Sequence, residues 1–332
     1  MTINGRGTAQ RSPAVVVFRL LNSSTVRILF FSIALLLAAF LPGQSVIPLY
    51  PEGIPCANAL EDITAQREDI ASIVTSVHTP LLHHYAPIPR ASSGTAIMII
   101  PGGGYTIEAW DLEGVDIGRR FLTEGMHVFI LQHRLPRHES GECKSHVALD
   151  DARRGVQTIR LLADSLGIDR RKVAVMGFSA GGHLAASAAI HYLERDSTAH
   201  PAAAAYSSRP DLSMPIYPVL VMDGSPVGHS GSAVALLGED FPQAPLLDFY
   251  NLPERVHANV PPTFLVHAAN DKAVVPENSI RYFTALQRVG VPVSLHLFAE
   301  GGHGFGSGKH VDGPVSHWLE LAVEWLRHHG FI

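Results

Sequence analysis

The sequence predicts an α/β fold with a mostly parallel central sheet and helices on both faces. Apolar runs alternate with helical patterns along most of the chain, 46% of the 332 residues are hydrophobic and 17% are charged, and no repeat or low-complexity segment is visible. Strands that alternate with helices of about ten or more residues are typical of βαβ crossovers, and therefore of parallel strands. A core of this size excludes a disordered or fibrous protein.

The first 45 residues are predicted to be a signal peptide or a membrane anchor ahead of a single folded domain, residues 46–332. Residues 1–27 contain four arginines and no Asp, Glu or Lys, and an apolar run follows over residues 28–41. A cationic stretch before a short apolar run is typical of an export signal. Ser45 is a small residue that suits cleavage just after it. We therefore expect an exported protein, with a membrane as partner only if the segment is uncleaved.

The rest of the chain reads as strands and helices in alternation. Residues 48–90 are rich in Pro and His and are predicted to be irregular, and residues 222–260 are predicted to be an insertion over one end of the sheet. Apolar runs of strand length predict strands, and apolar positions at helical spacing predict helices. The predicted strands are 95–100, 127–132, 172–176, 214–221, 263–268 and 293–298, and the predicted helices are 112–124, 148–166, 181–193, 278–289 and 315–326.

Charge and residue types limit the partners and cofactors. The formal net charge is -5 and no run of Lys and Arg with interleaved aromatic residues is present, so we expect no nucleic-acid partner. The two cysteines, Cys56 and Cys143, are too few for a disulfide scaffold, and both a single bridge and buried free thiols stay open. The pairs at 83–84 and 328–329 are histidines without metal-binding spacing, so we interpret them as surface residues and predict no metal site.

A serine lies between a predicted strand and a predicted helix. The pentapeptide GFSAG, residues 177–181, follows the strand 172–176 directly. Glycines on both sides permit a sharp turn that exposes the Ser179 hydroxyl at the amino terminus of the following helix. The bare pattern is weak, but this position favours a nucleophilic serine over an ordinary tight turn. His183, four residues after Ser179, is predicted to face into the fold as a structural residue.

A second glycine-rich loop, PGGGY at residues 101–105, ends the strand 95–100. Consecutive glycines leave backbone N–H groups unobstructed, which a developing negative charge on oxygen requires. We therefore predict an oxyanion hole made by the N–H groups of Gly103, Gly104 and Ala180. The alternative is a phosphate-binding loop or a plain turn, although the Lys-Ser/Thr of a P-loop is missing. Tyr105 either contacts the substrate or packs over its pocket.

An aspartate and a histidine complete a catalytic pattern. Asp271 follows the strand 263–268, and His303 lies between glycines after the strand 293–298. The carboxyl ends of parallel strands meet at one edge of a sheet, where ligands bind. A serine hydroxyl becomes a good nucleophile when an imidazole takes its proton, and a carboxylate orients that imidazole. The order Ser179, Asp271, His303 therefore predicts acyl transfer through a serine, with no metal or organic cofactor.

Residues 49–332 resemble bacterial α/β-hydrolases of the acetyl xylan esterase type. The matching segments are PGGGY at 101–105, RLP at 134–136, GFSAGGH at 177–183, SSRPD at 207–211, YPV at 217–219, PPTFLVHAANDKAVVPENS at 261–279 and GGHGFG at 301–306. The resemblance implies an α/β-hydrolase fold, Ser179, Asp271 and His303 as the triad, and acetyl or other short acyl esters on sugars, small-molecule or polysaccharide, as substrates. Gln132 and His133 depart from the charged residue and Tyr that are usual in this group.

Three other functions share part of this pattern. A serine peptidase of the prolyl-oligopeptidase type shares the fold and the triad but usually carries a further domain. A glycosidase needs two carboxylates beside a sugar-binding cleft, and no such pair is recognisable. A non-catalytic carbohydrate-binding relative would be expected to lose a triad member, whereas all three positions are filled. A carboxylic ester hydrolase is therefore the predicted function, with the acyl group and the alcohol left open.

Overall fold

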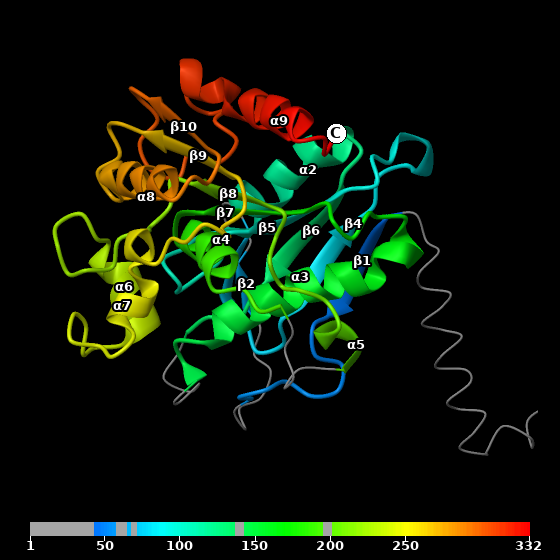
Figure 1. Ribbon diagram of the computed structural model, residues 1–332, viewed down its shortest axis with the longest axis horizontal. Helices are drawn as coiled ribbons and strands as arrows, with labels where there is room; N and C mark the ends of the chain where they lie inside the picture. The colour runs from blue at the N-terminus through cyan, green and yellow to red at the C-terminus, as the bar shows by residue number, and fades with distance from the viewer. Residues whose placement is uncertain (1–42, 58–64, 68–71, 137–142, 195–200) are drawn as a thin grey trace, which may run out of the picture. The chain divides into compact units, whose positions relative to one another are not determined.

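The computed structural model describes residues 43–57, 65–67, 72–136, 143–194 and 201–332 (Figure 1). An eight-stranded sheet forms its centre, in the order β1-β4-β6-β5-β7-β8-β9-β10. β4 runs antiparallel to β6, and all neighbours from β6 to β10 are parallel. The strands are β1 (Gln44–Pro48), β2 (Ala65–Arg67), β3 (Ile73–Ser76), β4 (Leu81–Tyr85), β5 (Ala96–Ile100), β6 (His127–Gln132), β7 (Val173–Phe178), β8 (Leu212–Ile216), β9 (Thr263–Ala268) and β10 (Val293–Phe298). The predicted, mostly parallel sheet is confirmed.

Helices cover both faces of this sheet, because successive strand residues point to opposite sides. On one face Met98 and Val175 pack with α3 and α4, and α8 joins α4 in a neighbouring cluster. On the other face Ile99 and Ala174 pack with α2 and α9. Figure 1 shows these helices beside the sheet. The helices are α2 (Asp116–Thr123), α3 (Val147–Leu166), α4 (Ser179–Ile190), α5 (Pro201–Ala204), α6 (Ser230–Leu237), α7 (Leu247–Tyr250), α8 (Glu277–Arg288) and α9 (Trp318–His328). The prediction of helices on both faces is confirmed.

The segment that was predicted to be irregular, residues 48–90, contains regular strands. β4 belongs to the main sheet, and β2 pairs with β3 in a separate antiparallel ribbon. The inward positions of β4 are Leu82 and His84, and His84 is only 3% exposed and contacts the ring of His127 at 3.0 Å between nitrogens. Because the inward position 84 is a histidine rather than an apolar residue, the sequence of this strand lacks the alternation of apolar and polar residues that predicts a strand. The interpretation of His84 as a surface residue was therefore wrong.

The other elements agree with the sequence except at their ends. In place of the predicted helix 112–124, the structure has a π-helix, Trp110–Val115, that continues into α2. α4 begins at Ser179 rather than at 181. β8 ends at Ile216 rather than at 221, because the next residue, Tyr217, has a φ of +35° and turns the chain away from the sheet. This early exit places Tyr217 at the carboxyl edge, beside the other residues that follow strands.

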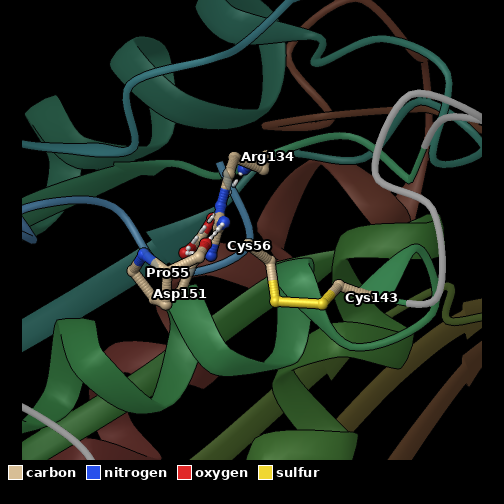
Figure 2. Close-up of a disulfide and its surroundings, with 5 residues drawn as sticks. All are labelled: Pro55, Cys56, Arg134, Cys143 and Asp151. Atoms are coloured by element: carbon tan, nitrogen blue, oxygen red, sulfur yellow. Dashed lines mark hydrogen bonds and ion pairs between the residues drawn. A yellow bond between two sulfur atoms is a disulfide. The ribbon is translucent and has the colours of Figure 1, made fainter. Parts of the chain in front are cut away.

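A disulfide joins Cys56 to Cys143, 87 residues apart in sequence (Figure 2). Beside it, Arg134 forms a buried ion pair with Asp151 at 2.7 Å and donates a hydrogen bond of 2.6 Å to the carbonyl oxygen of Pro55. The disulfide and the hydrogen bond from Arg134 to Pro55 therefore both hold the chain before β2 against the rest of the domain, and Arg134 is itself fixed by Asp151 on α3. Of the two states that the sequence left open for the cysteines, the structure has the bridge.

Replacing Cys56 and Cys143 together by serine is expected to lower the free energy of unfolding by about 2–5 kcal/mol, because the bridge closes a long loop in the unfolded chain. Urea unfolding followed by circular dichroism measures the change. A thiol reductant should shift the wild-type transition in the same direction and leave that of the double variant unchanged. Equal midpoints for the wild type and the double variant would contradict a stabilising bridge.

The prediction for the amino-terminal 45 residues concerns a segment that is almost entirely outside the described residues, which begin at residue 43. It therefore stays a prediction. β1 spans the predicted boundary after Ser45. In the part of the chain that the structure describes, no helix is both long and apolar enough to cross a membrane.

Candidate active site

Ser179 lies in a strained turn between β7 and α4. Its φ is +51°, in the left-handed region that residues other than glycine rarely adopt. A Cβ atom at residue 177 would lie 2.1 Å from the carbonyl oxygen of Gly181, and one at residue 181 would lie 2.3 Å from that of Ile100. Both positions therefore require glycine, which explains the spacing of the GFSAG segment. The strand-to-helix turn that the sequence predicted around Ser179 is present.

The structure brings Ser179, His303 and Asp271 together at the carboxyl edge of the sheet. The distance from Ser179 Oγ to His303 Nε2 is 2.9 Å, and the distance from His303 Nδ1 to Asp271 Oδ2 is 2.7 Å. Because a carboxylate only accepts hydrogen bonds, Nδ1 carries the proton and Nε2 is left to accept from the serine hydroxyl. The His303 side chain is 24% exposed and that of Asp271 is buried. A substrate can therefore reach the imidazole while the carboxylate stays shielded.

Asp271 is held by a set of donors. Its Oδ1 atom accepts the N–H groups of Ala273 and Val274 at 2.9 Å each, and its Oδ2 atom lies 3.3 Å from Nε2 of the buried His267. Burial alone would raise the pKa of Asp271, but hydrogen bonds from His267, His303 and the Val274 N–H outweigh it and hold that pKa well below its usual range. Asp271 is therefore a carboxylate at any pH at which the protein works. His267 was missed from the sequence, although it is the one polar residue between the apolar positions of the β9 segment FLVHA.

The glycine loop after β5 offers free backbone donors. The carbonyl oxygens of Gly102 and Gly103 accept hydrogen bonds from the turn that follows, whereas the N–H groups of Gly103 and Gly104 have no partner among the described residues. The N–H of Ala180 lies in the first turn of α4, where backbone donors lack an acceptor within the helix. These three groups have the chemistry that an oxyanion needs. Their role as an oxyanion hole stays a prediction.

Tyr105 and His183 form a buried pair. The Tyr105 hydroxyl donates to Nδ1 of His183 at 2.7 Å, and Nε2 of His183 donates to the carbonyl oxygen of Tyr250 at 3.0 Å. Burial lowers the pKa of His183 to about 4, so the ring is neutral. The prediction that His183 is structural and faces into the fold is confirmed. Tyr105 is only 3% exposed and its hydroxyl is already paired, so the structure gives it a packing role and its contact with substrate stays a prediction.

Two further residues at this edge were not singled out from the sequence. Glu113 accepts the Gly102 N–H at 2.7 Å through Oε2 and the Tyr217 hydroxyl at 2.8 Å through Oε1. Tyr217 in turn accepts the Gly306 N–H at 3.1 Å, and its ring edge meets the ring of His303 at 5.1 Å between centroids. Glutamate on a helix is usually exposed, so its burial here is not visible in a periodicity pattern. For Tyr217 the available signal was the YPV segment, which matched the family resemblance.

The insertion at residues 222–260 borders the glycine loop. His229 caps the amino terminus of α6, where its Nδ1 atom accepts the Ser232 N–H at 3.2 Å. The Ser232 hydroxyl oxygen lies 3.8 Å from the position that a Cβ atom would take at Gly104. The predicted placement of the insertion over one end of the sheet is confirmed. Within the described residues, no group of three or more His, Cys, Asp or Glu side chains could hold a metal ion.

A mostly parallel sheet with a serine elbow after one strand, and with an aspartate and a histidine after two others, defines an α/β-hydrolase. Comparison with known proteins identifies the family. The BD-FAE family matches residues 82–286, and the chain belongs to it. The chain is 33% identical to the acetylxylan esterase of Xylanibacter ruminicola over 224 residues, which are 67% of this chain and 43% of that protein. It therefore spans less than half the length of that relative.

Solved structures show the same fold. An acetyl ester-xyloside bifunctional hydrolase from Caldicellulosiruptor lactoaceticus is 30% identical and superposes with a TM-score of 0.73, over 88% of this chain and 99% of that one. The carboxylesterase Cest-2923 from Lactobacillus plantarum is 23% identical, with a TM-score of 0.62 over 82% of this chain and 99% of that one. The predicted α/β-hydrolase fold is confirmed.

Proposed function

We propose that this chain is a serine carboxylic ester hydrolase that removes acetyl or other short acyl groups from carbohydrate such as xylan. The observation that carries the proposal is the hydrogen-bonded series Ser179–His303–Asp271, with distances of 2.9 and 2.7 Å, at the edge where strand ends meet. The names of two relatives, an acetylxylan esterase and an acetyl ester-xyloside bifunctional hydrolase, support the substrate class.

The first half of the reaction forms an acyl-enzyme. Ser179 Oγ attacks the ester carbonyl carbon while its proton passes to His303 Nε2. The carbonyl oxygen becomes an anion that accepts the N–H groups of Gly103, Gly104 and Ala180. When this intermediate collapses, the carbon–oxygen bond to the alcohol breaks and His303 gives its proton to the departing oxygen.

The second half releases the acid. A water molecule gives a proton to His303 Nε2 as its oxygen attacks the acyl carbon, and the new tetrahedral anion uses the same three N–H groups. Collapse breaks the bond to Ser179 Oγ, which takes the proton back from His303. Throughout, Asp271 keeps the imidazole in the required tautomer and stabilises its charged form, because its own pKa is held low.

The place of action that we propose is outside the cytoplasm. Two observations support it, the disulfide between Cys56 and Cys143 and the arginine-containing segment with an apolar run before residue 43. The substrate is then a small-molecule or polysaccharide ester met in the periplasm or the medium. A membrane is a partner only if that segment is uncleaved.

The proposal is tested by incubating the protein with acetylated xylan and measuring acetate and reducing sugar in the same sample. We expect acetate without new reducing ends, because ester cleavage leaves the sugar chain intact. New reducing ends without acetate would overturn the proposal in favour of a glycosidase. Cleavage of a short-chain aryl ester without acetate release from xylan would keep the serine esterase and overturn the carbohydrate substrate.

The rate is expected to fall towards acid pH, because a protonated imidazole cannot accept the serine proton. Asp271 stays ionised there, since its pKa is held well below its usual range, so the fall is not caused by loss of the carboxylate. The measurement is kcat/KM for a short aryl ester against pH, with circular dichroism at each pH as the control for unfolding. A plateau that extends down to about pH 4 would contradict this role of His303.

A further inference from the structure

The loop that carries the proposed oxyanion donors and the loop that carries His303 come from distant parts of the chain. The first follows β5 and the second follows β10, at opposite sides of β7 in the sheet. Between them runs one buried series of hydrogen bonds. The Gly102 N–H donates to Glu113 at 2.7 Å, the Tyr217 hydroxyl donates to Glu113 at 2.8 Å, and the Gly306 N–H donates to Tyr217 at 3.1 Å.

We propose that Glu113 and Tyr217 are positioning residues, which hold the glycine loop in register with the His303 loop so that a substrate carbonyl meets its donors and its base together. This inference rests on the proposed function and deepens it. Neither residue takes part in the bond changes; each acts through a backbone N–H of a loop that does. We call the pair the Glu113–Tyr217 brace.

The brace has the features of a fixed element. Glu113 is buried and Tyr217 is fully buried, so none of the three hydrogen bonds competes with water. Both oxygens of Glu113 accept, which suits a carboxylate rather than a carboxylic acid. Burial raises the pKa of Glu113 above its usual value, and the hydrogen bonds from Tyr217 and the Gly102 N–H and the charge of His303 offset only part of this rise. Tyr217 adopts a φ of +35° to make its contacts, and such strain is concentrated at functional sites.

The brace also adds a negative charge to the surroundings of His303. Polar and titratable groups from five segments face or influence this imidazole. They are Asp271 after β9, Ser179 on α4, Tyr217 after β8, Glu113 on the π-helix, and His229 at the start of α6. Of these, Asp271 and Glu113 are the two acids. A nearby anion favours a protonated imidazole, so Glu113 assists Asp271 when His303 takes the proton from Ser179.

The test compares Tyr217→Phe and Glu113→Gln with the wild type on a short aryl ester. Tyr217→Phe removes the hydroxyl that joins Glu113 to Gly306, and kcat is expected to fall about tenfold to a hundredfold with KM changed less than about threefold. Glu113→Gln keeps the shape and removes the charge. We expect a similar loss of kcat and a shift of the acid limb of kcat/KM to lower pH by about half a unit or more.

Tyr282→Phe is the matched control. Tyr282 is also fully buried, but it lies on α8 and its hydroxyl has no hydrogen-bond partner among the described residues. Its loss should leave kcat within about twofold. Thermal unfolding of each variant shows whether it is folded. If one of the two brace variants misfolds, the kinetics of the other still test the proposal.

Ser179→Ala in the same assay separates the two proposals. If Ser179→Ala is inactive while folded Tyr217→Phe and Glu113→Gln match the wild type in kcat and pH profile, the brace is overturned and the serine mechanism stands. If Ser179→Ala retains full activity, the proposed function itself fails. A loss confined to KM in the brace variants would also overturn a positioning role in the chemical step.

Discussion

Ser179→Ala is expected to lower kcat for ester hydrolysis by about 10⁴- to 10⁶-fold, the largest effect of any single substitution in this chain. The alanine keeps the backbone of the turn but removes the oxygen that lies 2.9 Å from His303 Nε2. No acyl-enzyme can then form, and only the backbone donors and substrate binding remain to accelerate attack by water. Steady-state kinetics with a short aryl ester measure the loss.

Ser213→Ala is the control for this substitution. Ser213 is a fully buried serine on β8, and its hydroxyl has no hydrogen-bond partner among the described residues. The control should keep kcat within about twofold, since the deleted hydroxyl makes no hydrogen bond to the described residues and lies outside the proposed reaction. If folded Ser179→Ala retained kcat within about tenfold of the wild type, Ser179 would not be the nucleophile.

Asp271→Asn is expected to lower kcat by about 10³- to 10⁴-fold. The asparagine carbonyl can still accept the N–H groups of Ala273 and Val274. Its amide nitrogen, however, is a donor, and would donate a hydrogen bond to His303 Nδ1. This favours the tautomer of His303 that carries its proton on Nε2. That tautomer cannot accept the Ser179 proton, so the geometry survives and the base is lost.

Asp223→Asn is the control for the charge change, because Asp223 forms a partly exposed ion pair with Arg281 at 3.4 Å and lies outside the proposed machinery. Such a pair contributes little to the free energy of unfolding, so the variant should stay folded and kcat should change less than about twofold. The stability of Asp271→Asn is checked by thermal unfolding. If this variant is folded and its kcat lies within tenfold of the wild type, Asp271 does not orient the base.

The residues of the site that could be predicted from the sequence all follow strands that the pattern of apolar residues predicts. β7, β9 and β10 are short apolar runs, and parallel strand ends converge at one edge, so the positions of Ser179, Asp271 and His303 along the chain already indicated that they meet. The glycines at 177 and 181 added a second signal, because close backbone approach leaves no room for a side chain there. Local pattern and global fold agree at these positions.

The residues that could not be predicted are polar side chains buried by partners far away in sequence. The buried His84 has His127 as its hydrogen-bond partner. The buried Glu113 has Tyr217, 104 residues further along the chain. A single-sequence pattern assigns such residues to the surface, because burial of a polar group depends on a partner that only the folded chain supplies. The same reason explains why β4 was missed. β8 was predicted too long for a different reason, because the apolar run continues to residue 221 while the turn at Tyr217 ends the strand.

The central claim is that Ser179 becomes acylated, and labelling with an alkyl fluorophosphonate tests it most directly. The reagent's phosphorus forms a bond to an activated serine oxygen as fluoride leaves, and the product imitates the tetrahedral intermediate. Peptide mass spectrometry should find one adduct, on Ser179, in proportion to the esterase activity lost, and none in Ser179→Ala. Loss of activity with the adduct on another residue, or undiminished activity with Ser179 fully labelled, would contradict the claim.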